Sequence, residues 1–220
     1  MTLKLITILL AFSGFSQAAK PLKIDVYLES LCPASKAFMQ EQLKPNYDEI
    51  KNDVLLKFIP FGKSQSTTNS SGTFFDCQHG RYECETNMFQ ACSLNLIGDD
   101  QERQTQFMIC TMETQPERFP CAEKAGLKID DVKKCTEGEE GIKLQLENEK
   151  LTKPIINQSG HVPSIVFNGI WTEEDDDAAQ ENFLKIVQDK LKEDFVIKEW
   201  LLYRIYKFMG IIKMFKFLYF

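Results

Sequence analysis

The chain has 220 residues and a formal net charge of -6 at pH 7, because 26 lysines and arginines stand against 32 aspartates and glutamates. This acidic balance argues against nucleic acid as a main partner. The chain is long enough to bury a hydrophobic core and to form one or two domains.

The first 18 residues have the pattern of a secretory signal peptide. Lys4 precedes an apolar run from Leu5 to about Phe15, and small residues lead to Ala18. The run is too short to span a bilayer, so a retained membrane anchor is the weaker interpretation. We therefore expect residues 1–18 to be cleaved and the mature chain to follow the secretory route.

The cysteine pattern fits an oxidising compartment, where most thiols are paired. Cys32 stands apart from the other six cysteines, so the simplest count is three structural disulfides and one free thiol, with the pairing left open. The six are Cys77, Cys84, Cys92, Cys110, Cys121 and Cys135. Two glycosylation patterns, at Asn69 and Asn157, agree with the same route.

A strand followed by a helix is predicted around Cys32. Residues 22–28 alternate apolar and polar side chains, as in a half-buried strand. Pro33 suits the first turn of a helix, which we expect to end at Pro45. Cys32 would then lie at the helix N-terminus, where free N–H groups and the helix dipole favour a thiolate. Cys32 is therefore a candidate nucleophile, with a buried, inert cysteine as the alternative.

The middle of the chain predicts one more strand and then a long helical insertion. Residues 53–61 form the second predicted strand, and Gly62 begins a polar loop. From Cys77 to about Leu151 the pattern indicates short helices held by disulfides. We place the insertion at about residues 63–151.

A third strand is predicted at residues 162–170, closed by the turn-forming pair Asn168 and Gly169. Pro163 stands near its start, where a proline needs the first position or a special geometry. Thr172 is the expected N-cap of the next helix, whose acidic first turn fits the helix dipole better than a calcium site. The order strand, helix, strand, insertion, strand, helix indicates an α/β fold.

The C-terminal residues differ from the rest of the chain. Residues 200–220 are apolar and aromatic, with four cations and no acid. The cations argue against a membrane-spanning helix, and a basic amphipathic surface helix and an end outside any folded domain are equal alternatives. The domain plan is a signal peptide at 1–18, one domain at 19–195, and a tail at 196–220 without an assigned structure.

One motif in the insertion is specific enough to suggest a family. The stretch CQHGRYECETNMFQAC fits the pattern Cys-Gln-His-Gly-x2-Glu-Cys-x2-Asn-x4-Cys and resembles the signature of the gamma-interferon-inducible lysosomal thiol reductase family. The stretches YLESLCPASKAF and VPSIVFNG are also similar to the family's active-site helix and proline strand. The matching signature residues are Cys77, Gln78, His79, Gly80, Glu83, Cys84, Asn87 and Cys92.

The resemblance implies a thioredoxin-like fold with a disulfide-rich helical insertion. It also implies a secreted or endosomal and lysosomal enzyme that reduces disulfides in protein substrates and needs no cofactor. In such folds a cis proline lies beside the reactive thiol, and Pro163 would take that place, with the Val162 backbone pairing with an extended substrate.

The signature block does not itself indicate catalysis or a metal. The spacing of its cysteines around His79 does not match usual zinc ligand pairs, so we assign no metal here. Gln78, His79, Glu83 and Asn87 are expected to brace a loop or line the substrate groove. A role for His79 as proton donor to a leaving thiolate is the sharper alternative.

The active-site motif departs from the family's Cys-x-x-Cys pattern, because Ser35 stands where the second cysteine is expected. A second cysteine resolves the mixed disulfide, which a serine cannot do. Ser35 can donate a hydrogen bond to the Cys32 thiolate, and release would then depend on an external small thiol. Two hypotheses follow: a single-cysteine thiol oxidoreductase or isomerase, and a secreted binding protein on a scaffold whose redox function has lapsed.

Overall fold

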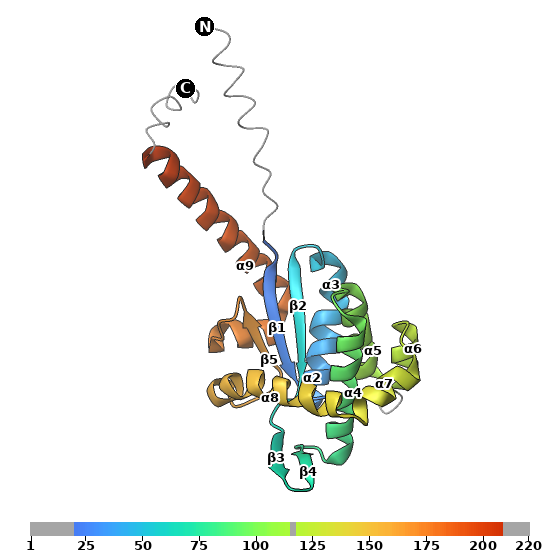
Figure 1. Ribbon diagram of the computed structural model, residues 1–220. Coiled ribbons are helices and arrows are strands. Elements are labelled where there is room, and N and C mark those ends of the chain that lie inside the picture. The colour runs from blue at the N-terminus through green and yellow to red at the C-terminus, as the bar shows by residue number, and fades with distance from the viewer. Residues whose placement is uncertain (1–19, 115–117, 209–220) are drawn as a thin grey trace.

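The computed structural model describes residues 20–114 and 118–208. A three-stranded sheet forms its centre (Figure 1), with β1 (Leu22–Leu28) between β2 (Val54–Pro60) and β5 (Ser164–Phe167). β2 runs parallel to β1 and β5 runs antiparallel to it. The three predicted strands are confirmed, and β5 is shorter than expected because Asn168 and Gly169 turn the chain at positive φ. The predicted signal peptide lies outside the described residues.

The helix after Cys32 does not end at Pro45, which corrects the sequence prediction. It begins as α2 (Pro33–Ala37), continues as a π-helical segment η1 (Phe38–Leu43) and ends as α3 (Lys44–Ile50). Pro45 lies in the first turn of α3, directly after the π segment, where the Lys44 N–H bonds to the carbonyl of Met39. Pairing over five residues widens the helix and lets the chain pass a residue that has no N–H to donate.

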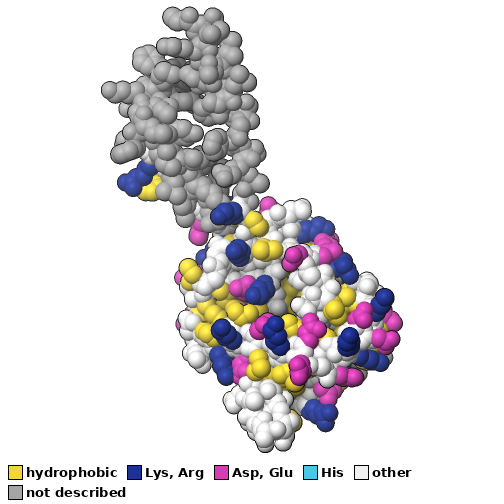
Figure 2. All heavy atoms as spheres, viewed as in Figure 1, with side chains coloured by type: hydrophobic (Ala, Val, Ile, Leu, Met, Phe, Trp, Pro, Cys, Tyr) yellow, Lys and Arg dark blue, Asp and Glu magenta, His cyan; other side chains and the backbone are white. Residues whose placement is uncertain are grey.

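The polar loop predicted after Gly62 is instead a hairpin of β3 (Gln65–Asn69) and β4 (Gly72–Asp76). Almost all of its side chains are exposed or half-buried, so the alternation of apolar and polar residues that marks a strand is absent. Figure 2 shows the hairpin as an uncharged polar projection on the face in view.

The insertion is helical and disulfide-linked, as predicted, although two of its helices are long. It contains α4 (Arg81–Ile97), α5 (Gln101–Glu113), α6 (Phe119–Lys124), α7 (Ile129–Thr136) and α8 (Glu139–Ser159). Three disulfides join it internally: Cys77–Cys84, Cys92–Cys135 and Cys110–Cys121. The first fixes the end of the hairpin to α4, and the other two join helix to helix.

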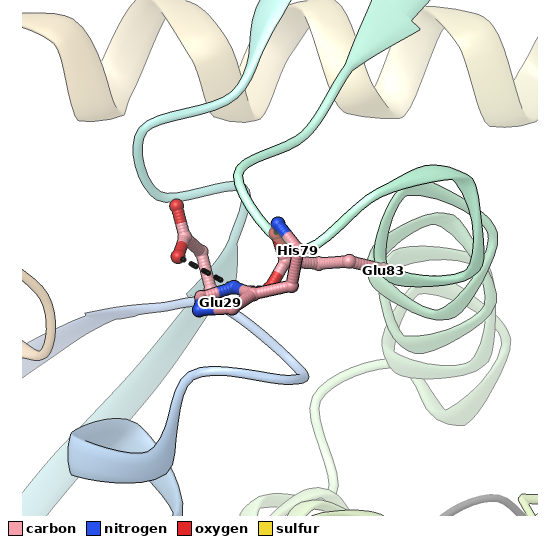
Figure 3. A group of neighbouring side chains, drawn as sticks. All are labelled: Glu29, His79 and Glu83. Atoms are coloured by element: carbon pink, nitrogen blue, oxygen red, sulfur yellow. Dashed lines mark hydrogen bonds and ion pairs between the residues drawn. The ribbon is translucent and has the colours of Figure 1, made fainter.

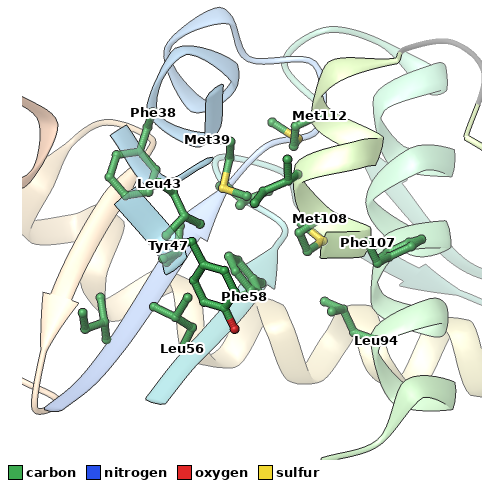
Figure 4. Close-up of a cluster of buried hydrophobic side chains, with 14 of the residues drawn as sticks. Phe38, Met39, Leu43, Tyr47, Leu56, Phe58, Leu94, Phe107, Met108 and Met112 are labelled. Atoms are coloured by element: carbon green, nitrogen blue, oxygen red, sulfur yellow. The ribbon is translucent and has the colours of Figure 1, made fainter. Parts of the chain in front are cut away.

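The main hydrophobic core lies between the sheet, the helical run after Cys32, and helices α4 and α5 (Figure 4). Phe38, Met39 and Tyr47 face Leu56 and Phe58 of β2 from one side. A smaller cluster of Tyr27, Ile59 and Val166 has partly buried Ile155 and Trp171 packed against it. Strand β1 contributes side chains to both clusters, and Cys32 follows its end by four residues.

The C-terminal helix α9 (Glu173–Phe208) begins where Thr172 predicted a cap, since the Asp175 N–H bonds to the Thr172 hydroxyl at 3.1 Å. Asn182 interrupts it with non-helical backbone angles and accepts the Lys185 N–H, which restarts the helix. The expected boundary at residue 195 falls inside α9, whose end leaves the body of the molecule (Figure 1), and residues 209–220 lie outside the description. None of the helices in the described ranges is long and apolar enough to cross a membrane.

Candidate active site

Cys32 lies at the N-cap of α2 and is the free cysteine of the chain. Its N–H bonds to the Glu29 carbonyl at 3.3 Å, and its carbonyl accepts the Lys36 N–H at 3.0 Å. The residue is buried, with 9% of its surface exposed. The sulfur therefore lies at the N-terminal end of the helical run that begins at Pro33.

The loop before β5 faces the thiol. The Val162–Pro163 peptide bond is cis, and the Cys32 Sγ donates to the Val162 carbonyl at 3.6 Å. Val162 and Pro163 are buried, and β5 behind them is an edge strand of the described sheet. The structure therefore brings the two segments that sequence similarity singled out, 130 residues apart, into one site.

Ser35 lies one turn after Cys32 and is fully buried. Its hydroxyl oxygen accepts the Glu29 N–H at 3.4 Å, and no hydrogen bond joins it to Cys32 within the described part of the chain. The Ser35 hydroxyl thereby gives the buried Glu29 N–H a hydrogen-bond acceptor and links the end of β1 to the helix. A contact between Ser35 and the Cys32 thiolate stays a prediction.

The signature residues of α4 hold the backbone just before Cys32. The Asn87 amide oxygen accepts the Ser30 N–H at 2.9 Å, and the Glu83 carboxylate accepts the Leu31 N–H at 3.3 Å. The Ser30 hydroxyl donates to the Glu83 carbonyl at 3.3 Å. Glu83 and Asn87 are fully buried, so these bonds are shielded from water and they fix the approach to the nucleophile.

The other signature residues play different parts. Gly80 forms the N-cap of α4 at φ 85, a conformation that favours glycine. Gln78 is exposed and does not take part in the brace. His79 is bonded to Glu83 twice, through its N–H at 3.1 Å and through Nδ1 at 2.6 Å.

Glu29 completes a cluster that the sequence did not reveal (Figure 3). It follows β1 and lies 50 positions before His79, whose Nδ1 is 3.6 Å from Glu29 Oε2. Burial raises the pKa of Glu29 above its usual value of 4.5, and the nearby Glu83 carboxylate adds to this. The Lys63 N–H, which donates to Glu29 Oε1 at 2.5 Å, and the charges of His79 and Lys63 act in the opposite direction. The one feature of the sequence that points to Glu29 is its position, three residues before the candidate nucleophile Cys32.

A second buried acid, Asp176, anchors the proline strand to α9. It accepts hydrogen bonds from the Ile165 N–H at 2.9 Å and from Trp171 Nε1 at 2.7 Å. His161 Nε2 lies 3.7 Å from its carboxylate. Burial raises the pKa of Asp176 above 3.8, although these hydrogen bonds and the charge of His161 oppose the shift. From the sequence, Asp176 is predicted only as one of several acids in the first turn of a helix, and its buried role is not indicated.

Solved structures of similar shape include two bacterial proteins. BdbD from Bacillus subtilis superposes with a TM-score of 0.55 at 15% identity, over 81% of this chain and 89% of that one. A DsbA from Chlamydia trachomatis gives a TM-score of 0.54 at 11% identity, over 80% and 88%. At such low identity these matches establish the fold, which is thioredoxin-like.

Sequence comparison identifies the family. Residues 23–138 match the profile of "Gamma interferon inducible lysosomal thiol reductase (GILT)". The protein of that name in Carassius auratus is 30% identical over 175 residues, which is 77% of this chain and 68% of that one. GILT-like protein 1 of Drosophila melanogaster is 31% identical over 190 residues, covering 78% and 75%. The chain therefore belongs to the gamma-interferon-inducible lysosomal thiol reductase family, a family of thiol-disulfide oxidoreductases.

Proposed function

We propose that this protein acts on disulfides of protein substrates through a single nucleophilic cysteine, Cys32. The observation that carries the proposal is the position of the free thiol, at the start of a helical run and against the Val162 carbonyl. The other six cysteines are paired in three disulfides. Cys32 therefore supplies the one free thiol for the reaction.

The proposed reaction passes through a mixed disulfide on Cys32. The Cys32 thiolate attacks one sulfur of a substrate disulfide, that S–S bond breaks, and the second sulfur leaves as a thiolate that takes up a proton. The substrate is then bound to Cys32 as a mixed disulfide. In one route an external small thiol attacks the Cys32 sulfur and releases the reduced substrate, and a second small thiol then frees Cys32 and leaves as a disulfide with the first. In the other route another thiolate of the substrate attacks the substrate sulfur of the mixed disulfide and restores Cys32. The first case reduces the substrate and the second rearranges its disulfides.

The loop before β5 is the proposed edge for the substrate. Val162 and Pro163 border the thiol, and an extended peptide could pair with the Val162 backbone while its disulfide meets Cys32 Sγ. The hydrogen bond from the Cys32 thiol to the Val162 carbonyl supports this arrangement, because it places the loop backbone beside the sulfur.

The site of action that we propose is the lumen of endosomes or lysosomes, or the space outside the cell. Relatives from Carassius auratus and Mus musculus carry "lysosomal" in their names. Three disulfides in the described chain fit an oxidising compartment.

Trapping of the mixed disulfide tests the proposal. The protein, with its disulfides intact, is incubated with a disulfide-linked peptide pair, quenched with acid, and analysed by mass spectrometry. One peptide is expected on Cys32 and none on Cys32→Ser. In the presence of excess small thiol, the wild type should cleave the pair catalytically, and unchanged turnover in Cys32→Ser would refute the catalytic role.

A second candidate function is a binding protein on the same scaffold. The specific observations that favour it are the 9% exposure of Cys32 and the buried serine at position 35. Alkylation of Cys32 measured against pH separates the two functions. Labelling that stays fast below pH 7 supports the enzyme, whereas slow labelling at every pH supports the binding protein.

A further inference from the structure

The side chains of Glu29, His79 and Glu83 take no step in the thiol reaction proposed above, although Glu83 also braces the backbone before Cys32. Their ligand atoms lie within 4.8 Å of one another and converge from the end of β1, the loop after β4 and the first turn of α4 (Figure 3). Both carboxylates are fully buried, while the His79 side chain is 33% exposed. The cluster therefore opens to solvent on the imidazole side.

The cluster contains more negative charge than its surroundings balance. Glu29 Oε2 is buried and accepts no hydrogen bond, and it faces His79 Nδ1 at 3.6 Å. A single imidazole, even when protonated, offsets only one of the two carboxylates, and the other cation that acts on Glu29, Lys63, is exposed. A buried carboxylate oxygen without a partner is costly, so the arrangement suits an added cation.

We propose that Glu29, His79 and Glu83 bind one divalent cation of the zinc class, with water completing the coordination. Zinc takes carboxylate oxygen and imidazole nitrogen at about 2.0–2.2 Å, which places tetrahedral ligand atoms about 3.4 Å apart. The 3.6 Å between His79 Nδ1 and Glu29 Oε2 already fits. The 2.6 Å between His79 Nδ1 and Glu83 Oε2 would lengthen as the metal replaces the shared proton. One nitrogen and two oxygens favour zinc over calcium, which needs more oxygen ligands.

The ligands are held in place by their own neighbours. Gly62, at φ 61, packs so closely on Glu29 that a Cβ would collide with the glutamate Cγ. The next residue, Lys63, donates its N–H to Glu29 Oε1 and leaves Oε2 directed at His79. Glu83 is held by the His79 and Leu31 N–H groups. Such secondary contacts orient ligands before a metal arrives.

Zinc titration in the Cys32→Ser background tests the site without the soft thiol as a competing ligand. The metal-stripped, disulfide-intact protein is titrated with Zn²⁺ at neutral pH by calorimetry, with a chelator as competitor. We expect one Zn²⁺ per chain, and an affinity at least tenfold weaker in His79→Gln and in Glu29→Gln. His161→Gln is the matched control, because His161 is the chain's other histidine and also faces a buried carboxylate. Its affinity should not change.

The outcomes separate the site from any effect on folding or on catalysis. Near-ultraviolet circular dichroism checks each variant, and His79 is exposed enough for its replacement to leave the core intact. Affinity should also fall as pH falls, because protons compete for the same ligands. Absence of saturable binding in Cys32→Ser, or equal binding in folded His79→Gln, overturns the proposal. Since the thiol is already removed, neither result bears on the oxidoreductase function.

Discussion

Ser35 decides how the proposed reaction ends. It stands one turn after Cys32, where the family pattern has a second cysteine, and its hydroxyl bonds to the Glu29 N–H rather than to the thiol. We expect Ser35→Cys to cleave a disulfide-linked peptide pair in a single turnover without an external thiol, because the new sulfur can resolve the mixed disulfide. Quenched-flow mass spectrometry of the Cys32 adduct measures this.

The matched control is Cys32→Ser/Ser35→Cys, which keeps one thiol but moves it to the buried position. It should neither form an adduct nor cleave the substrate. If Ser35→Cys gains nothing while its Cys32 still reacts with an alkylating reagent, position 35 is too far out of line for resolution.

Asp176 should make the protein's stability depend on pH. Burial raises its pKa above 3.8, so between that value and the raised one the folded state binds more protons than the unfolded state. The stabilising contribution is therefore complete below about pH 3.8 and is lost as pH rises through the folded pKa. In the wild type, Asp176 should make the unfolding free energy fall as the pH rises toward neutral. In Asp176→Asn this part of the fall should be absent.

Denaturant unfolding at several pH values, with the disulfides intact, measures the effect. Asp177→Asn replaces an exposed neighbouring acid and should keep the wild-type pH profile. Parallel profiles for wild type and Asp176→Asn would contradict the prediction.

At the scale of elements, α4 braces the backbone before Cys32. Asn87 accepts the buried Ser30 N–H, and Asn87→Ala removes that hydrogen bond. We expect the unfolding free energy to fall by about 0.5–1.5 kcal/mol, the usual net contribution of one hydrogen bond. Alkylation of Cys32 should also change, because the Ser30 and Leu31 backbone sets the position of the thiol.

Asn95→Ala is the matched control on the same helix. Asn95 is exposed and bonds to Glu140 on the surface, so its loss should change stability by less than about 0.5 kcal/mol. Equal losses in the two variants, measured by denaturant unfolding, would mean that the bond to Ser30 does not brace the site.

Local patterns predicted the strands of the central sheet and the start of α9, but not every element. The β3–β4 hairpin was missed because its exposed threonines and serines carry no alternation. Pro45 was taken as a stop, although the π turn before it removes the conflict with its missing N–H. Both errors arise where the usual signal depends on burial or on regular α geometry.

At the scale of the molecule, the disulfides should differ in their contribution. Cys92–Cys135 closes a separation of 43 residues, and Cys77–Cys84 closes one of 7. In the chain-entropy description, these loops correspond to about 4 and about 2 kcal/mol. We expect the double alanine variant at Cys92 and Cys135 to lose more unfolding free energy than the one at Cys77 and Cys84. Denaturant unfolding without reductant measures both, and a reversed order would contradict it.

The candidate site was predictable only where a motif or a family pattern marked it. Cys32 and Pro163 were named from sequence, and the structure adds the contact between Cys32 and Val162. The sequence does not predict the role of Glu29, because its proximity to His79 depends on how β1, the hairpin and α4 pack together. No residue spacing in the chain indicates that packing. Asp176 was hidden among neighbouring acids for the same reason.

The close packing of Gly62 against Glu29 limits which substitutions positions 62 and 29 can accept. Any other residue at position 62 would meet both an unfavourable φ of 61 and the side chain of Glu29, whereas at Gly72 a Cβ would find nothing within 4 Å. A larger residue at 62 could be accepted only together with a smaller one at 29. A substitution at position 62 should therefore be retained only after the side chain at position 29 has become smaller, whereas a smaller residue at position 29 meets no clash with Gly62.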